Sequence, residues 1–562
     1  MVKRILTFLN KEFHGVNEAA LMLGGFAFLS QLLGLVRDRT LAHIVGAGPV
    51  LDIYYAAFRI PDFLYISIAS LASVTVLMPF LADKINSDHD GKEKARKFIN
   101  NIFSAYMLFM IAVSIIVAIF IPNIARYIAP GFNEEQISLL VTTSRIMLFS
   151  PIFIGLSNLV GTITQLFKNF FVFSLSPIFY NIGILFGIIF IYPSLGVKGL
   201  AIGVVLGAIM HLIIQLPVVM SHGFFPKLVS KINWLEVWDV VKLSAPRTLT
   251  LSCNSLAFIA LIAMASTIKS GSISLFTFAY NLQSVPVGII GISYSVAAFP
   301  VLVKCFSTKN ISAYTTYILN AARHIIFWSF PVIVLMIVLR AQIVRVVLGS
   351  NSFSWSDTRL TAASAALFVI SLISQSLVLL FVRGYYAASN TKKPLIINIF
   401  SSFMIIIFAY LFLYILGHNT NIISSLEILL RVYNVPGTMM LALPLAYTCG
   451  SILNFFLIWF LFKKDFLKGH SSKLFKTFIQ SFIGSLVMGF VSYFFLGIFD
   501  DVFNITTGRG IFFQGLLSGI LGIASGVLVL YLMKNRELAD LIKTLSHKFW
   551  KNKVLAPEQG EL

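Results

Sequence analysis

The sequence is short of charge. Only 11% of its 562 residues are charged, against about 25% in ordinary soluble domains, so a soluble fold of this length could not cover its surface. Cysteine is scarce as well. Cys253, Cys305 and Cys449 stand far apart and form no CxxC pair, which excludes a disulfide framework. We interpret them as small apolar packing residues.

Chemical motifs are also missing. The sequence has no metal-ligand cluster, no glycine-rich phosphate loop and no nucleophile elbow, so we expect neither an enzyme nor a bound cofactor. An ion gradient or the membrane potential would have to supply energy, and the coupling ion stays open. The segment Met1–Phe13 lacks a small-residue cleavage site, so the first apolar segment is expected to remain as a helix.

Long apolar runs are what the sequence does have, at 58% hydrophobic residues. Runs that can cross ~30 Å of hydrocarbon predict an all-α polytopic membrane protein of about fourteen transmembrane helices. Their length, and the lack of two-residue alternation, exclude a membrane β-barrel. The predicted centres lie near Phe28, Ala69, Ala112, Ile154, Gly183, Val205, Phe258, Ile290, Ser329, Ser374, Ile407, Tyr447, Val487 and Ile520.

Basic residues set the expected orientation. The net charge is +20, and Lys and Arg gather in both tails and in alternate connectors, notably Lys84–Lys97 and Lys463–Lys476. By the positive-inside rule we expect a multi-pass protein of the bacterial cytoplasmic (inner) membrane with both termini in the cytoplasm. The basic balance therefore reflects topology and contact with anionic lipids, and it gives little support to nucleic-acid binding.

An internal repeat divides the chain. Pro79 matches Pro300 at a separation of 221 residues, and Asn181 matches Asn398 after a loop shortened by four. Parallel repeats of six spans would place a substrate cavity between two lobes that rock against each other. The predicted parts are an N-lobe at 1–225, a C-lobe at 226–465, two additional spans at 466–535 and a basic cytoplasmic tail at 536–562.

Charged residues within apolar runs are the candidate binding groups. An ionisable side chain at membrane depth costs at least ~2.5–3.5 kcal/mol, so each needs a partner or a watery cavity. We expect Arg37 and Arg59 to line the cavity and bind phosphate, with Asp38 and Asp52 orienting them. The alternative is that these groups are interfacial and fix helix ends. Arg247 is the second-lobe candidate for an anion contact, and its alternative is snorkelling to the interface.

Several motifs resemble those of one family. The run Ser30–Asp38, followed by Gly46-Ala47-Gly48, Asp52 and Phe58-Arg59-Ile60-Pro61, resembles the signature of lipid II flippases of the MurJ/MviN type. Two further motifs support the resemblance. The first is Ala129-Pro130-Gly131-Phe132. The second consists of two neighbouring runs, Arg383-Gly384-Tyr385-Tyr386-Ala387 and Asn390-Thr391-Lys392-Lys393-Pro394. The resemblance covers the first twelve spans. It implies the multidrug/oligosaccharidyl-lipid/polysaccharide exporter fold and alternating-access export of undecaprenyl-diphosphate-linked peptidoglycan precursor, with cavity arginines on the diphosphate.

The resemblance carries Arg37, Asp38 and Asp52 over directly. Asn281 stands where the family often has arginine, and Gln31 and Tyr65 are neutral at positions that are usually basic. We therefore expect a substrate site of Arg37, Asp38, Asp52, Arg59, Arg247 and Asn281 whose glycan specificity is open. The alternatives are a flippase for an O-antigen or capsular lipid-linked glycan, a cation-coupled drug exporter, and a scaffold for envelope-synthesis proteins.

Overall fold

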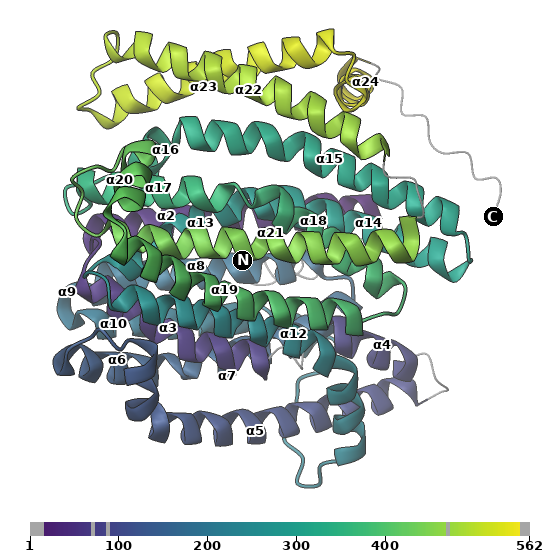
Figure 1. The fold of residues 1–562 in the computed structure, drawn as a ribbon. Helices are drawn as coiled ribbons and strands as arrows, with labels where there is room; N and C mark the ends of the chain where they lie inside the picture. Colours follow the sequence, from purple (N-terminus) through teal and green to yellow (C-terminus); the bar gives the residue numbers. More distant parts are fainter. Residues whose placement is uncertain (1–15, 69–73, 86–89, 468–471, 551–562) are drawn as a thin grey trace. The chain divides into compact units, whose positions relative to one another are not determined.

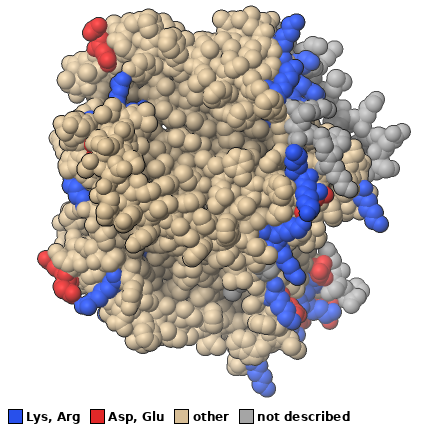
Figure 2. All heavy atoms as spheres, viewed as in Figure 1, with Lys and Arg blue, Asp and Glu red and all other residues tan. Residues whose placement is uncertain are grey.

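The computed structural model describes residues 16–68, 74–85, 90–467 and 472–550, and every regular element in these ranges is a helix (Figure 1). The all-α prediction is confirmed. Eleven helices are long and apolar enough to cross a membrane, or up to 12 if the bent pair α17 (Trp355–Val369) and α18 (Leu372–Ala387) is one span. On the face drawn in Figure 2, charged side chains gather near helix ends, as expected for helices that cross a bilayer.

The predicted centres of the spans fall within helices, except for Ala69, which lies outside the described residues. The first two predicted spans correspond to α2 (Val16–Ile44) and α3 (Pro49–Ser67). Neither helix is among those counted as long and apolar enough to cross a membrane, and α3 carries Asp52, Arg59 and Asp62 within its 19 residues. The count of fourteen stays a prediction for that reason, while the positions of the helices agree with it.

The chain packs as two compact units. The first comprises residues up to Val285 together with Val344–Ser371 and Ser389–Leu457, and the second comprises Pro286–Ile343, Leu372–Ala388 and the chain from Ile458 onward. These are units of packing, and the division into two six-span lobes stays a prediction. Besides α2, α3 and α17, the first unit contains α4 (Val74–Ile85), α5 (Gly91–Ile128), α6 (Glu134–Met147), α7 (Phe149–Leu166), α8 (Phe170–Phe186), η2 (Gly187–Ile191), α9 (Tyr192–Leu195), α10 (Val197–Ile213), α11 (Leu216–Ser221), α12 (Trp234–Ser266), α13 (Ser272–Pro286), α19 (Lys392–His418), α20 (Thr420–Leu430), η4 (Thr438–Leu441) and most of α21 (Ala442–Phe462).

Glycines set the spacing of α8 and α10 within the first unit. A Cβ added to Gly203 would lie 2.6 Å from Gly187 Cα, and one added to Gly183 would lie 2.4 Å from Gly207 Cα. Small residues of this kind let two membrane helices approach closely enough for their backbones to touch. The contact fixes α10 against α8, and α10 supplies part of the cavity wall described below.

The Ala129–Phe132 motif is explained by a close backbone contact in the same unit. Gly131 N donates to Ser266 Oγ at 3.1 Å. A Cβ on Gly131 would lie 2.1 Å from the carbonyl oxygen of Ser266, so no larger residue fits without moving the backbone. The motif therefore joins the α5–α6 turn to the end of α12.

The second unit contains η3 (Val287–Ile292), α14 (Ser293–Ser307), α15 (Ile311–Val338), α18, η5 (Lys463–Leu467), α22 (Ser472–Asp500), α23 (Gly508–Leu532) and α24 (Arg536–Trp550), and α16 (Arg340–Leu348) begins in it. A buried ion pair fixes α24, where Arg323 Nη2 lies 2.5 Å from Glu537 Oε1. The Thr477 hydroxyl donates to the same oxygen at 2.9 Å. The Arg383–Ala387 motif also packs here, since the Tyr385 hydroxyl donates to Asp465 Oδ2 at 2.9 Å.

Candidate functional site

The site begins with Arg37 and Asp38, adjacent residues of α2. Arg37 donates from Nε and Nη2 to Asp38 Oδ1 at 3.0 and 2.9 Å. Its Nη1 also donates to Asn181 Oδ1 of α8, at a longer 3.4 Å. The Asp38 side chain is 5% exposed and that of Arg37 is 24% exposed. The carboxylate thus holds one edge of the guanidinium, while the other edge has a weaker partner.

Asn281 completes this cluster from α13. Its Nδ2 donates to Asp38 Oδ2 at 3.0 Å, so the two carboxylate oxygens of Asp38 contact different helices. The structure therefore brings together three of the predicted site residues, namely Arg37, Asp38 and Asn281. Asn281 contacts the carboxylate and so helps to fix its orientation.

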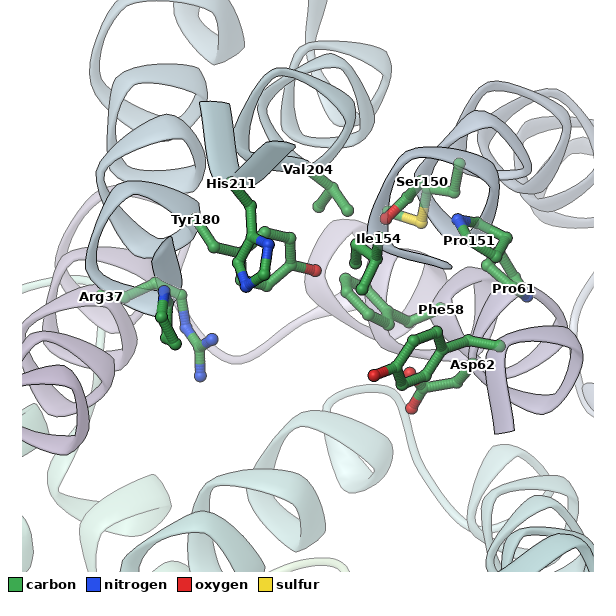
Figure 3. Close-up of a pocket in the computed structure, with 13 residues that line it drawn as sticks. Arg37, Phe58, Pro61, Asp62, Ser150, Pro151, Ile154, Tyr180, Val204 and His211 are labelled. Carbon is green, nitrogen blue, oxygen red and sulfur yellow. The ribbon is translucent and has the colours of Figure 1, made fainter. Parts of the chain in front are cut away.

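A cavity of about 300 Å³ lies beside Arg37 within the first unit (Figure 3). Arg37, Tyr180 and His211 are drawn on one side of it, and Phe58 and Asp62 on the other. Aromatic and proline carbons form much of the wall, with a few polar groups among them, which is the usual composition of a ligand pocket. The complete lining is Arg37, Phe58, Pro61, Asp62, Tyr65, Met147, Ser150, Pro151, Ile154, Pro177, Tyr180, Val204 and His211.

His211 has a fixed orientation in this wall. Its Nδ1 lies 2.7 Å from Ser157 Oγ, and Gln215 Nε2 donates to that hydroxyl at 2.5 Å. Tyr65 is similarly held, because its hydroxyl accepts from Asn158 Nδ2 at 3.1 Å. These bonds present preset polar groups to the cavity, as binding sites require.

Arg59 lies close to the cavity but does not line it. Its Nε donates to Tyr55 O at 3.2 Å, and its guanidinium stands 4.7 Å from the centre of the Phe258 ring. Its Nη1 is 3.9 Å from Asp62 Oδ2, and Asp62 does line the cavity. Arg59 thus packs α3 against α12 by a cation–π contact and reaches the cavity through Asp62.

Asp52 is placed differently from the sequence-based expectation. Its carboxylate accepts from Gly271 N at 2.6 Å, and from Ser274 N and Ser274 Oγ at 2.8 and 2.5 Å. Within the described residues all of its side-chain hydrogen bonds go to this turn at the start of α13. The expected contact with an arginine is therefore absent there, and Asp52 anchors α3 to α13 instead.

The remaining candidate is Arg247, which belongs to α12 but whose side chain lies outside the described residues. The substrate site predicted from the sequence did not include Asp62, His211 or Asn181, which the structure places on or beside the cavity. A signal existed for Asn181, because it is one of the positions repeated between the two halves of the chain. Asp62 stands three residues from Arg59 among the charges of the first two spans, and His211 is a single histidine in an apolar run, so nothing local separates a cavity wall from ordinary packing at either position.

The fold and the site together define a multi-pass α-helical membrane protein with a charged cluster beside an internal cavity. The sequence profile described as "Lipid II flippase MurJ" matches residues 41–420, so the chain belongs to the lipid II flippase MurJ family. A protein of Burkholderia cenocepacia named "Lipid II flippase MurJ" is 25% identical over 411 residues, covering 71% of this chain and 79% of that protein. A "Probable lipid II flippase MurJ" of Buchnera aphidicola subsp. Baizongia pistaciae is 25% identical over 448 residues, covering 79% and 82%.

Solved structures agree on the fold. The structure titled "Lipid II flippase MurJ, inward closed conformation" has a TM-score of 0.71 at 23% identity, covering 93% of this chain and 100% of that one. An inward-facing multidrug resistance MATE family transporter of the MOP superfamily has a TM-score of 0.63 at 16% identity, covering 81% and 99%. The fold of this transporter superfamily, expected from the sequence, is confirmed.

Proposed function

We propose that the protein translocates the undecaprenyl-diphosphate-linked peptidoglycan precursor, lipid II, across the cytoplasmic membrane by alternating access, with Arg37 binding the diphosphate. The observation that carries this is the position of Arg37 on the wall of a cavity in a chain of the lipid II flippase family. A guanidinium stays charged and donates in pairs to phosphate oxygens, which suits it to this task. Translocation makes and breaks no covalent bond, so we propose no catalytic residue and no cofactor, and an ion gradient or the membrane potential as the driving force.

Asp38 gives this binding a means of release. Before substrate arrives, its Oδ1 occupies Nε and Nη2 of Arg37. A diphosphate that reaches those donors has to replace the carboxylate, while Asn281 can keep hold of the other oxygen, Oδ2. One ionic contact is exchanged for another, so the net affinity is smaller than a free guanidinium would give. A transporter needs such moderate affinity because it must release its substrate on the far side.

The placement of both termini in the cytoplasm belongs to this proposal, supported by the basic connectors and tail.

A second candidate substrate is another glycan on the same lipid diphosphate carrier. The cavity wall favours it in one respect, since Asp62 and Tyr65 supply acidic and neutral groups there. Such groups hydrogen-bond the hydroxyls of any sugar, so they do not confine the site to the peptidoglycan precursor.

Binding in nanodiscs tests the proposal. Lipid II and an undecaprenyl diphosphate that carries an unrelated glycan are titrated against wild type, Arg37→Ala and Arg39→Ala. Arg39 is a matched control on the same helix, because it donates to the carbonyl oxygens of Val346 and Val347 and does not line the cavity. Removing one partner of a buried charge pair costs ~2 kcal/mol or more, so Arg37→Ala should weaken lipid II binding by at least roughly thirtyfold.

Arg39→Ala should stay near wild type in the same titration. Equal or tighter binding of the unrelated glycan lipid would move the substrate to the second candidate. Unchanged lipid II binding by Arg37→Ala would remove the diphosphate from this site.

A further inference from the structure

An apolar groove of about 580 Å³ lies on the first unit and shares no lining residue with the cavity beside Arg37. One wall is a single face of α5, formed by Ile102, Ala105, Tyr106 and Phe109 at helical spacing. The facing wall is the start of α12, and the end of α3 closes one side with Ile68. The α12 wall consists of Trp234, Leu235, Val237, Trp238, Val240 and Val241.

Polar contacts at one end of the groove fix its two walls. Asn233 N donates to Asn101 Oδ1 at 2.7 Å, and Asn101 Nδ2 donates to Asn233 O at 3.0 Å. Lys84 Nζ lies 2.8 Å from Glu236 Oε1 and so ties α4 to α12 as well. Because these bonds fix the start of α12 against α5 and α4, the groove between Ala105 and Trp238 has a defined shape.

Exposed basic residues border the groove at that end and again at Lys242, which follows Val241, the last α12 residue of the wall. Lys242 is exposed, and its Nζ stands 5.7 Å from the centre of the Trp238 ring. The loop before α12 lies along the first turns of α5, since Lys227 N donates to Asn100 Oδ1 at 2.8 Å. Figure 2 shows Lys and Arg side chains together where the ends of α4, α5 and α12 lie in Figure 1. The exposed basic residues of these segments are Lys92, Lys94, Arg96, Lys97, Lys227, Lys231 and Lys242, and the exposed acidic residues Asp90, Glu93 and Asp239 lie among them.

The groove combines apolar walls with nearby basic side chains, and these two features match the acyl chains and the charged headgroup of an anionic lipid. A glycerophospholipid with a net negative headgroup has acyl chains that fit an apolar groove and a phosphate that pairs with lysine. Basic pockets between transmembrane helices bind such headgroups, and tryptophans sit at the boundary between headgroup and hydrocarbon. Trp234 is 59% exposed and Trp238 is 55% exposed, so both rings are open to that boundary.

We propose that this groove is a binding site for one anionic glycerophospholipid, with an acyl chain between α5 and α12 and the phosphate at Lys242. This is independent of the substrate of the cavity, because no residue lines both spaces. The bound lipid would stabilise the packing of α12 against α5 in the stretch that follows the Asn101–Asn233 contact.

Quenching of tryptophan fluorescence tests the site. The full-length protein is reconstituted with phospholipids that carry brominated acyl chains, under either a phosphatidylglycerol or a phosphatidylcholine headgroup. The anionic lipid should quench more strongly, and the difference should disappear in a Trp234→Phe/Trp238→Phe variant. A surface lysine contributes ~1 kcal/mol to anionic-lipid binding, so Lys242→Gln should lower the preference for phosphatidylglycerol by roughly fivefold. Lys198→Gln, an exposed lysine at the start of α10, is the matched control and should leave it unchanged.

A second variant separates occupancy of the groove from general attraction to the surface. Ala105→Phe fills the apolar wall without changing charge and should abolish the headgroup-dependent quenching, whereas Ile119→Phe, on the exposed outer part of α5, should not. Equal quenching by both lipids, or a preference that persists in Lys242→Gln and Ala105→Phe, would overturn the proposal. Displacement of the quencher by undecaprenyl phosphate, but not by unlabelled phosphatidylglycerol, would assign the groove to a polyprenyl chain and also overturn it.

Discussion

Replacing Asp52 with asparagine tests whether this carboxylate serves the fold or the binding site. The side chain is 2% exposed, and its Oδ2 accepts the Gly271 N–H at 2.6 Å. Asparagine keeps one oxygen, which can still accept from Ser274. Its amide nitrogen then faces the Gly271 N–H, donor against donor. Losing a charge-assisted hydrogen bond and leaving a buried N–H unpaired should destabilise the protein by ~2–3 kcal/mol.

The assay is thermal unfolding of the purified protein in detergent, run beside lipid II binding by the folded fraction. We expect Asp52→Asn to lower the unfolding temperature by a few degrees, roughly what 2–3 kcal/mol produces in a large domain. Its affinity for lipid II should stay within about twofold, because small changes at a distant anchor transmit weakly to a binding site. The matched control is Asp62→Asn, whose side chain is 40% exposed and lines the cavity, so its stability should hardly change. Lost affinity at normal stability in Asp52→Asn would refute the structural role and return Asp52 to the substrate site.

Two further changes test the packing of the fold. Glu537→Gln leaves Arg323 buried without its counter-charge, which should cost ~3–5 kcal/mol and expose α24 to proteolysis; replacing both residues with methionine should restore much of the protection. If α24 stays protected in the single variant, the ion pair does not hold it. Gly203→Leu should reduce the folded yield severely because its Cβ would lie 2.6 Å from Gly187 Cα, whereas Gly25→Leu, with nothing within 4 Å, should fold normally. Equal yields from the two leucine variants would show that α8 and α10 need no close contact.

The positions of the helices could be predicted from the sequence because hydrophobic runs are local. A run of twenty apolar residues predicts a spanning helix whatever lies elsewhere in the chain. Breaks within the spans were harder to foresee. The π-helical turns η2 (Gly187–Ile191) and η3 (Val287–Ile292) interrupt apolar runs whose composition hardly changes across them.

The partners of the charged residues could not be predicted, because they depend on which helices meet. Asp38 and Asn281 are 243 residues apart, and the Asp52–Ser274 bond joins residues 222 apart. Sequence reasoning could say that each carboxylate needed a partner, since an unpaired one is costly in a membrane. It grouped Asp52 with Asp38 by their charge and proximity in sequence. Their actual partners differ, because Asp52 anchors the start of α13 and Asp38 binds Arg37.

Charged residues inside a membrane protein differ in whether the fold places them on a cavity wall or in a contact between helices. Arg59 donates from Nε to the Tyr55 carbonyl and stacks against the Phe258 ring near Asp62, so it packs α3 against α12 and does not line the cavity. Arg37 shares its inner edge with Asp38, and its Nη1 has only a 3.4 Å contact with Asn181. A guanidinium offers five donors, so Arg37 retains capacity on the side that faces the cavity. An arginine can bind a passing anion only where a cavity gives the anion access to its donors, and among the described arginines of the candidate site that condition favours Arg37 over Arg59.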